Sequence, residues 1–416
     1  MNGNKLAVVL LRVIFAVKQS LPQGGGLLPA VVLALVVQGA QAADAVPTMR
    51  PAKAARPELG SSAVFAPDGT LLAVAKQGEH VMVYRSSDEG RSWSPPAVVN
   101  AQPEAISADG ENRPKIAFAA DGALLVSWTH PFPKPNTGSI RFARATDGQT
   151  FSPVQTVHRD SAEITHRFES LLVMPDNRVI LAWIDKRDLE AAKANKAPWR
   201  GAGIYAAVST DGGRSFQPEH KLADHSCECC RVTSAIDADG APLFMWRHVF
   251  EPNERDHALA RLKPDGTVES VQRATFDRWK VDGCPHHGPS LAVDERGVRH
   301  AVWFNQKDGA GRVFYGRLAA GSGISVEGQR QVGGPRAAHA DMAVAPGKLA
   351  IAWKEFDGER TQLRGLISAD GGDNFSEIAL AATDGASDQA RVIRRQDQLF
   401  VFWRTEKEGF RLFPLP

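Results

Sequence analysis

The stretches that decide the fold are 86–93 (SSDEGRSW), 209–216 (STDGGRSF) and 368–375 (SADGGDNF), with a shortened copy at 145–151 (ATDGQTF). Their shared pattern is Ser-x-Asp-x-Gly-x-(Ser/Asn)-aromatic, which is typical of a hairpin turn. The Asp carboxylate accepts backbone N–H groups, the Gly adopts a positive φ, and the ring packs beneath the turn. Recurrence of this turn predicts a repeated unit of antiparallel strands. The turn aspartates are Asp88, Asp147, Asp211 and Asp370.

A second pattern recurs with the first: a short apolar segment that ends in Trp, as in 124–128 (LLVSW) and 179–183 (VILAW). From residue 128 onward these tryptophans are 55, 63, 57, 50 and 50 residues apart, which is about the length of a four-stranded propeller blade. We therefore expect them to pack between adjacent blades. They are Trp128, Trp183, Trp246, Trp303, Trp353 and Trp403, with Ala75 at the equivalent place in the first unit.

Counting units predicts an all-β propeller over residues 61–416, with seven blades favoured over six. The last unit has no segment left for an outer strand before Pro416. We expect a strand from residues 43–60 to complete it, so that N- and C-terminal strands together close the ring.

The repeated turn resembles the Asp box, or BNR repeat, of the sialidase-like β-propeller family. The resemblance covers about residues 60–416 and implies a propeller whose Asp boxes lie on the face away from the functional site. Cys-x-Cys-Cys at 227–230 and Gly-Cys-Pro at 283–285 further resemble an exported subgroup of that family.

The N-terminal segment has the layout of a signal peptide. Arg12 and Lys18 precede an apolar stretch at 27–37, and the small-x-small sequence Ala-Gln-Ala follows at 40–42. We predict cleavage after Ala42, a periplasmic or secreted protein, and no stable membrane span after cleavage.

Net charge is close to balanced, at +2 for the whole chain. Removing Lys5, Arg12 and Lys18 with the leader leaves 46 basic against 47 acidic residues. This balance gives no support to a nucleic-acid partner.

Export makes the four cysteines informative: Cys227, Cys229, Cys230 and Cys284. In an oxidising compartment we expect disulfides, with a Cys230–Cys284 link favoured. A soft-metal site for Cu or Zn is the alternative. Its candidate ligands are the four cysteines with His286 and His287.

In a blade of this order, the loops that lead into inner strands and the loops that follow Trp strands share one face. Long connections over a rigid scaffold are where binding residues tend to lie. Arginine at this face suits an anionic ligand, because its planar fork binds carboxylates. The predicted ligand-binding residues are Arg113, His166, Arg167, Arg231, Arg247, His248, His287 and His339.

The family resemblance implies an arginine triad, a Tyr nucleophile and an Asp acid/base if the protein is a sialidase. All three tyrosines, Tyr84, Tyr205 and Tyr315, fall in expected third strands, and the N-terminal Phe-Arg-Ile-Pro motif is absent. No sialidase catalytic residue is carried over. Candidate catalytic carboxylates for another reaction are Glu169, Asp341 and Asp388.

The sequence therefore predicts an exported, sialidase-like propeller that binds a glycan or small anion on its Cys/His/Arg face, without sialidase turnover. Three alternatives stay open: a divergent exo-sialidase or other glycoside hydrolase or lyase, a periplasmic Cu- or Zn-binding protein, and a docking ring for a protein partner.

Overall fold

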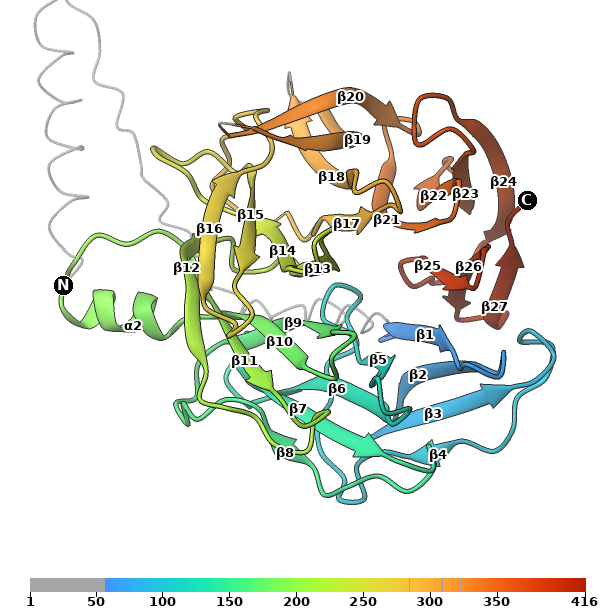
Figure 1. Ribbon diagram of the computed structural model, residues 1–416, viewed down its shortest axis with the longest axis horizontal. Helices are drawn as coiled ribbons and strands as arrows, with labels where there is room; N and C mark the ends of the chain where they lie inside the picture. The colour runs from blue at the N-terminus through green and yellow to red at the C-terminus, as the bar shows by residue number, and fades with distance from the viewer. Residues whose placement is uncertain (1–56, 284, 308–309, 322) are drawn as a thin grey trace, which may run out of the picture. The chain divides into compact units, whose positions relative to one another are not determined.

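A computed structural model describes residues 57–283, 285–307, 310–321 and 323–416. Seven antiparallel sheets, each built from consecutive strands, are arranged in a ring (Figure 1). The expected seven-bladed all-β propeller is confirmed. Six sheets have four strands, and the seventh has three.

The strands of the first three blades are β1 (Ser61–Phe65), β2 (Leu71–Gln77), β3 (His80–Ser86) and β4 (Ala97–Val98); β5 (Lys115–Phe118), β6 (Leu124–Pro131), β7 (Gly138–Ala145) and β8 (Gln155–Thr156); β9 (His166–Val173), β10 (Val179–Asp185), β11 (Ala202–Ser209) and β12 (His220–Ser226). Those of the other four are β13 (Thr233–Ile236), β14 (Pro242–Arg247), β15 (His257–Leu262) and β16 (Val268–Arg273); β17 (Ser290–Val293), β18 (Arg299–Lys307), β19 (Ala310–Ala320) and β20 (Ile324–Val332); β21 (Ala337–Ala345), β22 (Lys348–Phe356), β23 (Thr361–Ser368) and β24 (Ser376–Thr383); β25 (Arg391–Arg395), β26 (Gln398–Thr405) and β27 (Gly409–Pro414).

The ring closes where blade 7 meets blade 1, because β25 lies beside β1. Apolar side chains of both blades form one buried cluster there, including Phe65, Phe400 and Phe402. The expected closing strand from residues 43–60 is not seen in the described part: blade 7 has three strands and residues 57–60 form none. Residues 43–56 lie outside the described residues.

The six repeated tryptophans lie on the second strands of blades 2–7, and all are fully buried. Each packs against apolar side chains of the preceding blade, as Trp128 does against Val81 and Val83 of blade 1. Most also bond their indole N–H, as in the 3.0 Å bond from Trp403 Nε1 to the Asp388 carbonyl oxygen. These rings are the apolar filling between blades, as the sequence predicted.

The repeated Asp turns join third to fourth strands, on the face opposite the loops that lead into inner strands. In the turn of blade 3, Asp211 Oδ1 accepts the N–H groups of Arg214 and Ser215 at 2.9 and 3.0 Å. Ser215 Oγ donates to Asp211 Oδ2 at 2.6 Å. The turns of Asp88 and Asp370 repeat the bonds from the residue four positions on.

The long connection after β10 contains one helix, α2 (Arg187–Ala194), where the sequence suggested only a loop. Among the described residues no helix is long and apolar enough to span a bilayer.

Candidate functional site

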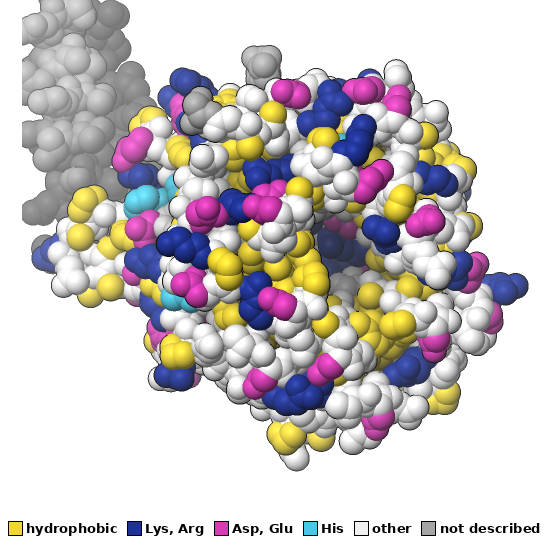
Figure 2. Space-filling model, viewed as in Figure 1, with side chains coloured by type: hydrophobic (Ala, Val, Ile, Leu, Met, Phe, Trp, Pro, Cys, Tyr) yellow, Lys and Arg dark blue, Asp and Glu magenta, His cyan; other side chains and the backbone are white. Residues whose placement is uncertain are grey.

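The candidate site is the central channel and its mouth, on the face opposite the Asp turns. Inner strands β1, β5, β9, β13, β17, β21 and β25 surround the channel. Figure 2 shows a hollow at the centre of the ring with Lys and Arg side chains in its floor. Such convergence of polar groups in a concave site is the usual sign of a binding site.

Glu111 and Arg231 form the central ion pair of the mouth. Arg231 Nη1 lies 2.9 Å from Glu111 Oε1, and both side chains are buried. Glu111 Oε2 also accepts the backbone N–H of Arg231 at 3.1 Å and that of Gly288 at 3.0 Å. A carboxylate in the connection after blade 1 thus fixes the connections that lead into blades 4 and 5.

Arg113 forms the second buried pair of the mouth. Its Nη1 lies 3.0 Å from Asp388 Oδ2 and donates to the Ser61 carbonyl oxygen at 2.8 Å. Gln389 links the two arginines, because its Oε1 accepts from Arg113 Nη2 at 3.0 Å and from Arg231 Nη1 at 3.3 Å. The expected arginine cluster therefore includes Arg113 and Arg231.

His339 belongs to the same network through its Nδ1 atom. The amide nitrogen of Gln389 lies 2.9 Å from this atom, and Glu111 Oε1 lies 3.3 Å from it. The tautomer of the ring decides which of the two bonds forms, because an amide NH₂ group donates and a carboxylate accepts. His339 also lines the mouth.

Electrostatics keep this network in one protonation state near neutral pH. Burial alone would raise the pKa of Glu111, but Arg231 and His339 hold that pKa well below its ordinary value. Burial lowers the pKa of His287 to about 3. Burial also lowers the pKa of His339, although Glu111 opposes the shift. Glu111 is therefore ionised and the two histidines are neutral.

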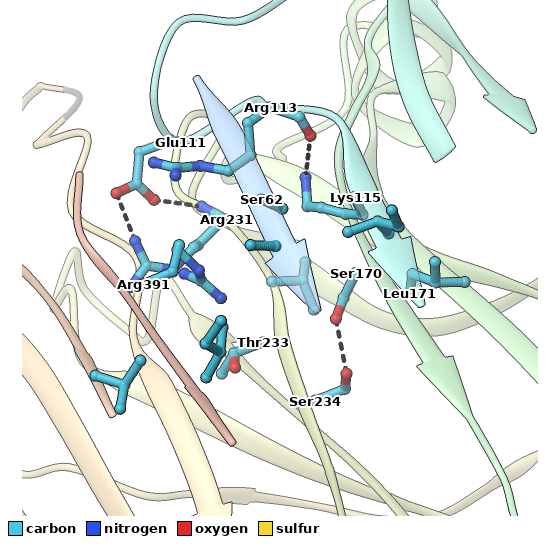
Figure 3. A pocket seen from close by; sticks show the side chains of 15 residues that line it. Ser62, Glu111, Arg113, Lys115, Ser170, Leu171, Arg231, Thr233, Ser234 and Arg391 are labelled. Carbon is cyan, nitrogen blue, oxygen red and sulfur yellow. Dashed lines mark hydrogen bonds and ion pairs between the residues drawn. The ribbon is translucent and has the colours of Figure 1, made fainter. Parts of the chain in front are cut away.

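Beneath this network is a cavity of about 270 Å³ that is lined by basic side chains. Figure 3 shows Arg113, Lys115, Arg231 and Arg391 around it, from β5, β25 and the connections before β5 and β13. Burial is the main cause that lowers the pKa of Arg391 to about 10; Asp341 opposes this, and Arg231 and Arg113 lower it further. The cations are thus close enough to repel one another.

Above the network, the mouth is a second cavity of about 460 Å³, which shares Glu111 with the first. Three residues that line it have left-handed backbone: Phe168 (φ 62°), His286 (φ 54°) and His339 (φ 54°). Bulges in the pairing of β9 with β10 and of β21 with β22 accompany two of them. Backbone strain in residues other than Gly is concentrated at binding and catalytic sites.

The three candidate catalytic carboxylates are all buried and bonded. Glu169 lies 3.4 Å from Lys115 Nζ and accepts from Ser127 and Thr129. Asp341 accepts from Ser290 Oγ at 2.9 Å and pairs with Arg391 at 3.1 Å. Asp388 pairs with Arg113, as described above.

Five of the eight predicted ligand-binding residues line neither cavity: His166, Arg167, Arg247, His248 and His287. Arg167 pairs with Asp109 at 3.2 Å and covers the ring of Phe168. His166 is fully buried and stacks on His158, with ring centroids 3.9 Å apart. Arg247 bonds the carbonyl oxygens of Arg255 and His287, and His248 packs against Phe250.

His287 stacks between Phe304 and His339, with ring centroids 4.0 and 4.2 Å away. Cys227, Cys229 and Cys230 are buried together in the connection between β12 and β13. Cys284, and with it the expected Cys230–Cys284 disulfide, lies outside the described residues.

Sequence reasoning missed four members of the site: Glu111, Lys115, Gln389 and Arg391. Lys115 and Arg391 are the first residues of inner strands, a position that the unit count could have singled out. Glu111 and Gln389 carry no local signal, because their partners come from distant blades.

No protein-family model matches the sequence, and no curated protein matches it significantly. Among solved structures, the protein is similar to a PL25 polysaccharide lyase, an ulvan lyase (TM-score 0.56, 11% identity, 86% of this chain and 92% of that chain). A structure of the PL25 lyase bound to -[GlcA(1-4)Rha3S]- also matches (TM-score 0.53, 12% identity, 86% and 94%). An α-L-arabinofuranosidase from Fusarium graminearum is similar as well (TM-score 0.50, 14% identity, 72% and 90%). At these identities the likeness establishes the propeller fold alone.

Proposed function

We propose that this protein is an exported propeller of the sialidase-like Asp-box type that binds an acidic oligosaccharide in the central channel, with an anionic group of the ligand in the cavity beneath the Glu111–Arg231 network. The observation that carries the proposal is the group of four cations, Arg113, Lys115, Arg231 and Arg391, around one cavity. Structural neighbours that are carbohydrate-active enzymes are consistent with a glycan ligand.

The charge arrangement favours an anionic group on the ligand. Arg391 is the most accessible of the four cations, with 30% of its side chain exposed, while its partner Asp341 is almost fully buried. Since neighbouring cations disfavour the charge on Arg391, a carboxylate or sulfate beside it relieves their repulsion. The planar guanidinium suits two parallel bonds to either group.

Binding without sialidase turnover is the form of the proposal that the site supports best. The chain's tyrosines lie on third strands: Tyr84 on β3, Tyr205 on β11 and Tyr315 on β19. Tyr205 bonds Asp188 and Tyr315 bonds His300, so neither faces the channel cavities. Each candidate catalytic carboxylate is bonded to a cation within the protein: Glu169 to Lys115, Asp341 to Arg391 and Asp388 to Arg113.

Isothermal titration calorimetry tests the proposal with an oligosaccharide that bears uronate and sulfate groups. Arg391→Gln should weaken its binding by about 10- to 100-fold, which corresponds to about 1.5–3 kcal/mol for hydrogen bonds to a charged group. Asp341 keeps its bonds from Ser290 and from the Val392 N–H, so the variant should still fold.

Arg364→Gln is the matched control, because Arg364 pairs with Glu377 on an exposed part of blade 6. It should leave the affinity unchanged, and an uncharged oligosaccharide of the same length should not bind. Equal weakening by both variants, equal binding of the neutral sugar, or release of sialic acid from a fluorogenic glycoside would each overturn the proposal.

A further inference from the structure

The connection between blades 3 and 4 brings three thiols together. Cys227 follows the last residue of β12, and Cys229 and Cys230 precede β13 by only a few residues. All three are buried, with relative exposures of 0%, 5% and 1%. They belong to the apolar core between the two blades, beside Trp246 and Phe168.

The sulfur atoms form a nearly equilateral triangle. Cys227 Sγ lies 3.8 Å from both Cys229 Sγ and Cys230 Sγ, and the third side of the triangle is 4.0 Å. A disulfide requires about 2.05 Å, so none of the three is bonded to another. Three thiolates at about 2.3 Å from one tetrahedral metal ion are about 3.8 Å apart, which agrees with the observed sides.

Positive side chains lie beside the three sulfur atoms. Arg255 Nη1 is 3.8 Å from Cys227 Sγ, and Arg247 is a second cation close to the same sulfur. Nearby positive charge suits thiolate ligands, which are negatively charged.

We propose that Cys227, Cys229 and Cys230 together bind one thiophilic metal ion, Zn²⁺ or Cu⁺, through their three Sγ atoms. Soft thiolate ligands select these ions. Each thiol that is protonated beforehand releases its proton to solvent as its metal–sulfur bond forms. The two arginines partly offset the negative charge that three thiolates leave on the complex.

The site has a structural consequence for the mouth. Arg231 follows Cys230 directly, and its backbone N–H and its guanidinium both bond Glu111. A metal ion that ties the three sulfurs together fixes the segment that carries Arg231 into the channel. This inference does not depend on the identity of the glycan or on its binding.

Elemental analysis of full-length protein, purified from the periplasm without chelators, tests the site. We expect about one Zn or Cu ion per chain. The identity of the ion shows whether the site binds Zn²⁺ or Cu⁺ in the cell. Cys227→Ser should lose most of the metal. Ser226→Ala should keep it, because Ser226 Oγ donates to the neighbouring carbonyl oxygen of Cys227 and is not a thiol ligand.

A second measurement guards against misfolding of the Cys227 variant. Wild-type protein is treated with an organomercurial reagent, and the ion released is followed with a colorimetric chelator. Release in step with thiol modification supports the site. Metal-free protein, a disulfide among these three cysteines in non-reducing peptide mapping, or full metal content in Cys227→Ser would overturn it.

Discussion

The two faces of the ring hold their acidic side chains in contrasting ways. On the turn face, the groups that donate hydrogen bonds to the Asp211 carboxylate all lie within four residues of it along the chain. On the mouth face, Glu111 bonds Arg231, Gly288 and His339, which lie 120, 177 and 228 residues away. The first arrangement is complete in a single turn, whereas the second exists only when the ring is assembled.

Burial separates the two faces as well. Glu111 and Arg231 are almost fully buried, whereas Asp88, Asp147 and Asp370 belong to exposed turns. A buried charge that loses its partner is costly, because solvent cannot replace the partner. We therefore expect substitutions at the mouth to affect the whole ring and substitutions in an Asp turn to stay local.

Glu111→Gln should have the largest effect on stability. It leaves the buried guanidinium of Arg231 without its counter-charge, and breaking such a pair costs about 3–5 kcal/mol. Urea unfolding measures the loss. Glu377→Gln removes an exposed partner of Arg364 and should change stability by less than about 0.5 kcal/mol. A similar small change for both variants would contradict the view that the mouth network is cooperative.

The two faces also differ in how acid affects their stability. On the mouth side, the relevant group is the buried imidazole of His158. Ile140 N–H donates to His158 Nε2 at 3.2 Å, and His158 Nδ1 lies 2.7 Å from the Asp160 carbonyl oxygen. The bond from Ile140 needs the neutral ring, because Nε2 can accept only when it is unprotonated, whereas Nδ1–H donates to the Asp160 carbonyl oxygen in either state. Burial, with His166 nearby, lowers the pKa of His158 to about 4 from an ordinary value of 6.5.

Because the folded pKa is depressed, the unfolded chain takes up the proton first as the pH falls. Stability is complete above about pH 6.5 and should decline by about 2–3 kcal/mol as the pH falls to about 4. Urea unfolding across this range measures the slope for wild type and for His158→Gln. The variant should show a shallower slope, and parallel slopes would show that His158 does not contribute.

The same contrast explains what the sequence could predict. Seven blades, the buried tryptophans and the Asp turns follow from local patterns that recur, so each copy supports the others. Arg113 and Arg231 were predicted at the channel because each occupies the same place in its unit. Glu111 and Gln389 were not predicted there. Sequence alone does not show that residues 120 or 158 positions apart share a hydrogen bond.

Position within a unit also has limits as a guide. Arg167 occupies the place equivalent to Arg113, yet it turns to Asp109 and the ring of Phe168. The bulge in β9 and the left-handed backbone of Phe168 change the local direction of the strand there. Irregularities of this kind depend on tertiary packing, which the repeat does not encode.

Asp211→Ala should have the smallest of these effects, about 1–2 kcal/mol, because the lost N–H and O–H bonds are partly replaced by water. The aromatic Phe216 still packs on Phe142, with ring centroids 5.0 Å apart, so the fold should persist.

Hydrogen bonds within the turn outweigh the opposing effect of burial and lower the pKa of Asp211 from 3.8 to about 2. Its contribution is therefore complete above about pH 4 and is lost as the pH falls through about 2. Urea unfolding at pH 7 and pH 3 measures the effect, which should shrink at the lower pH. Affinity for the acidic oligosaccharide should not change in the folded variant, and a loss of binding with unchanged stability would mean that the two faces are assigned the wrong way round.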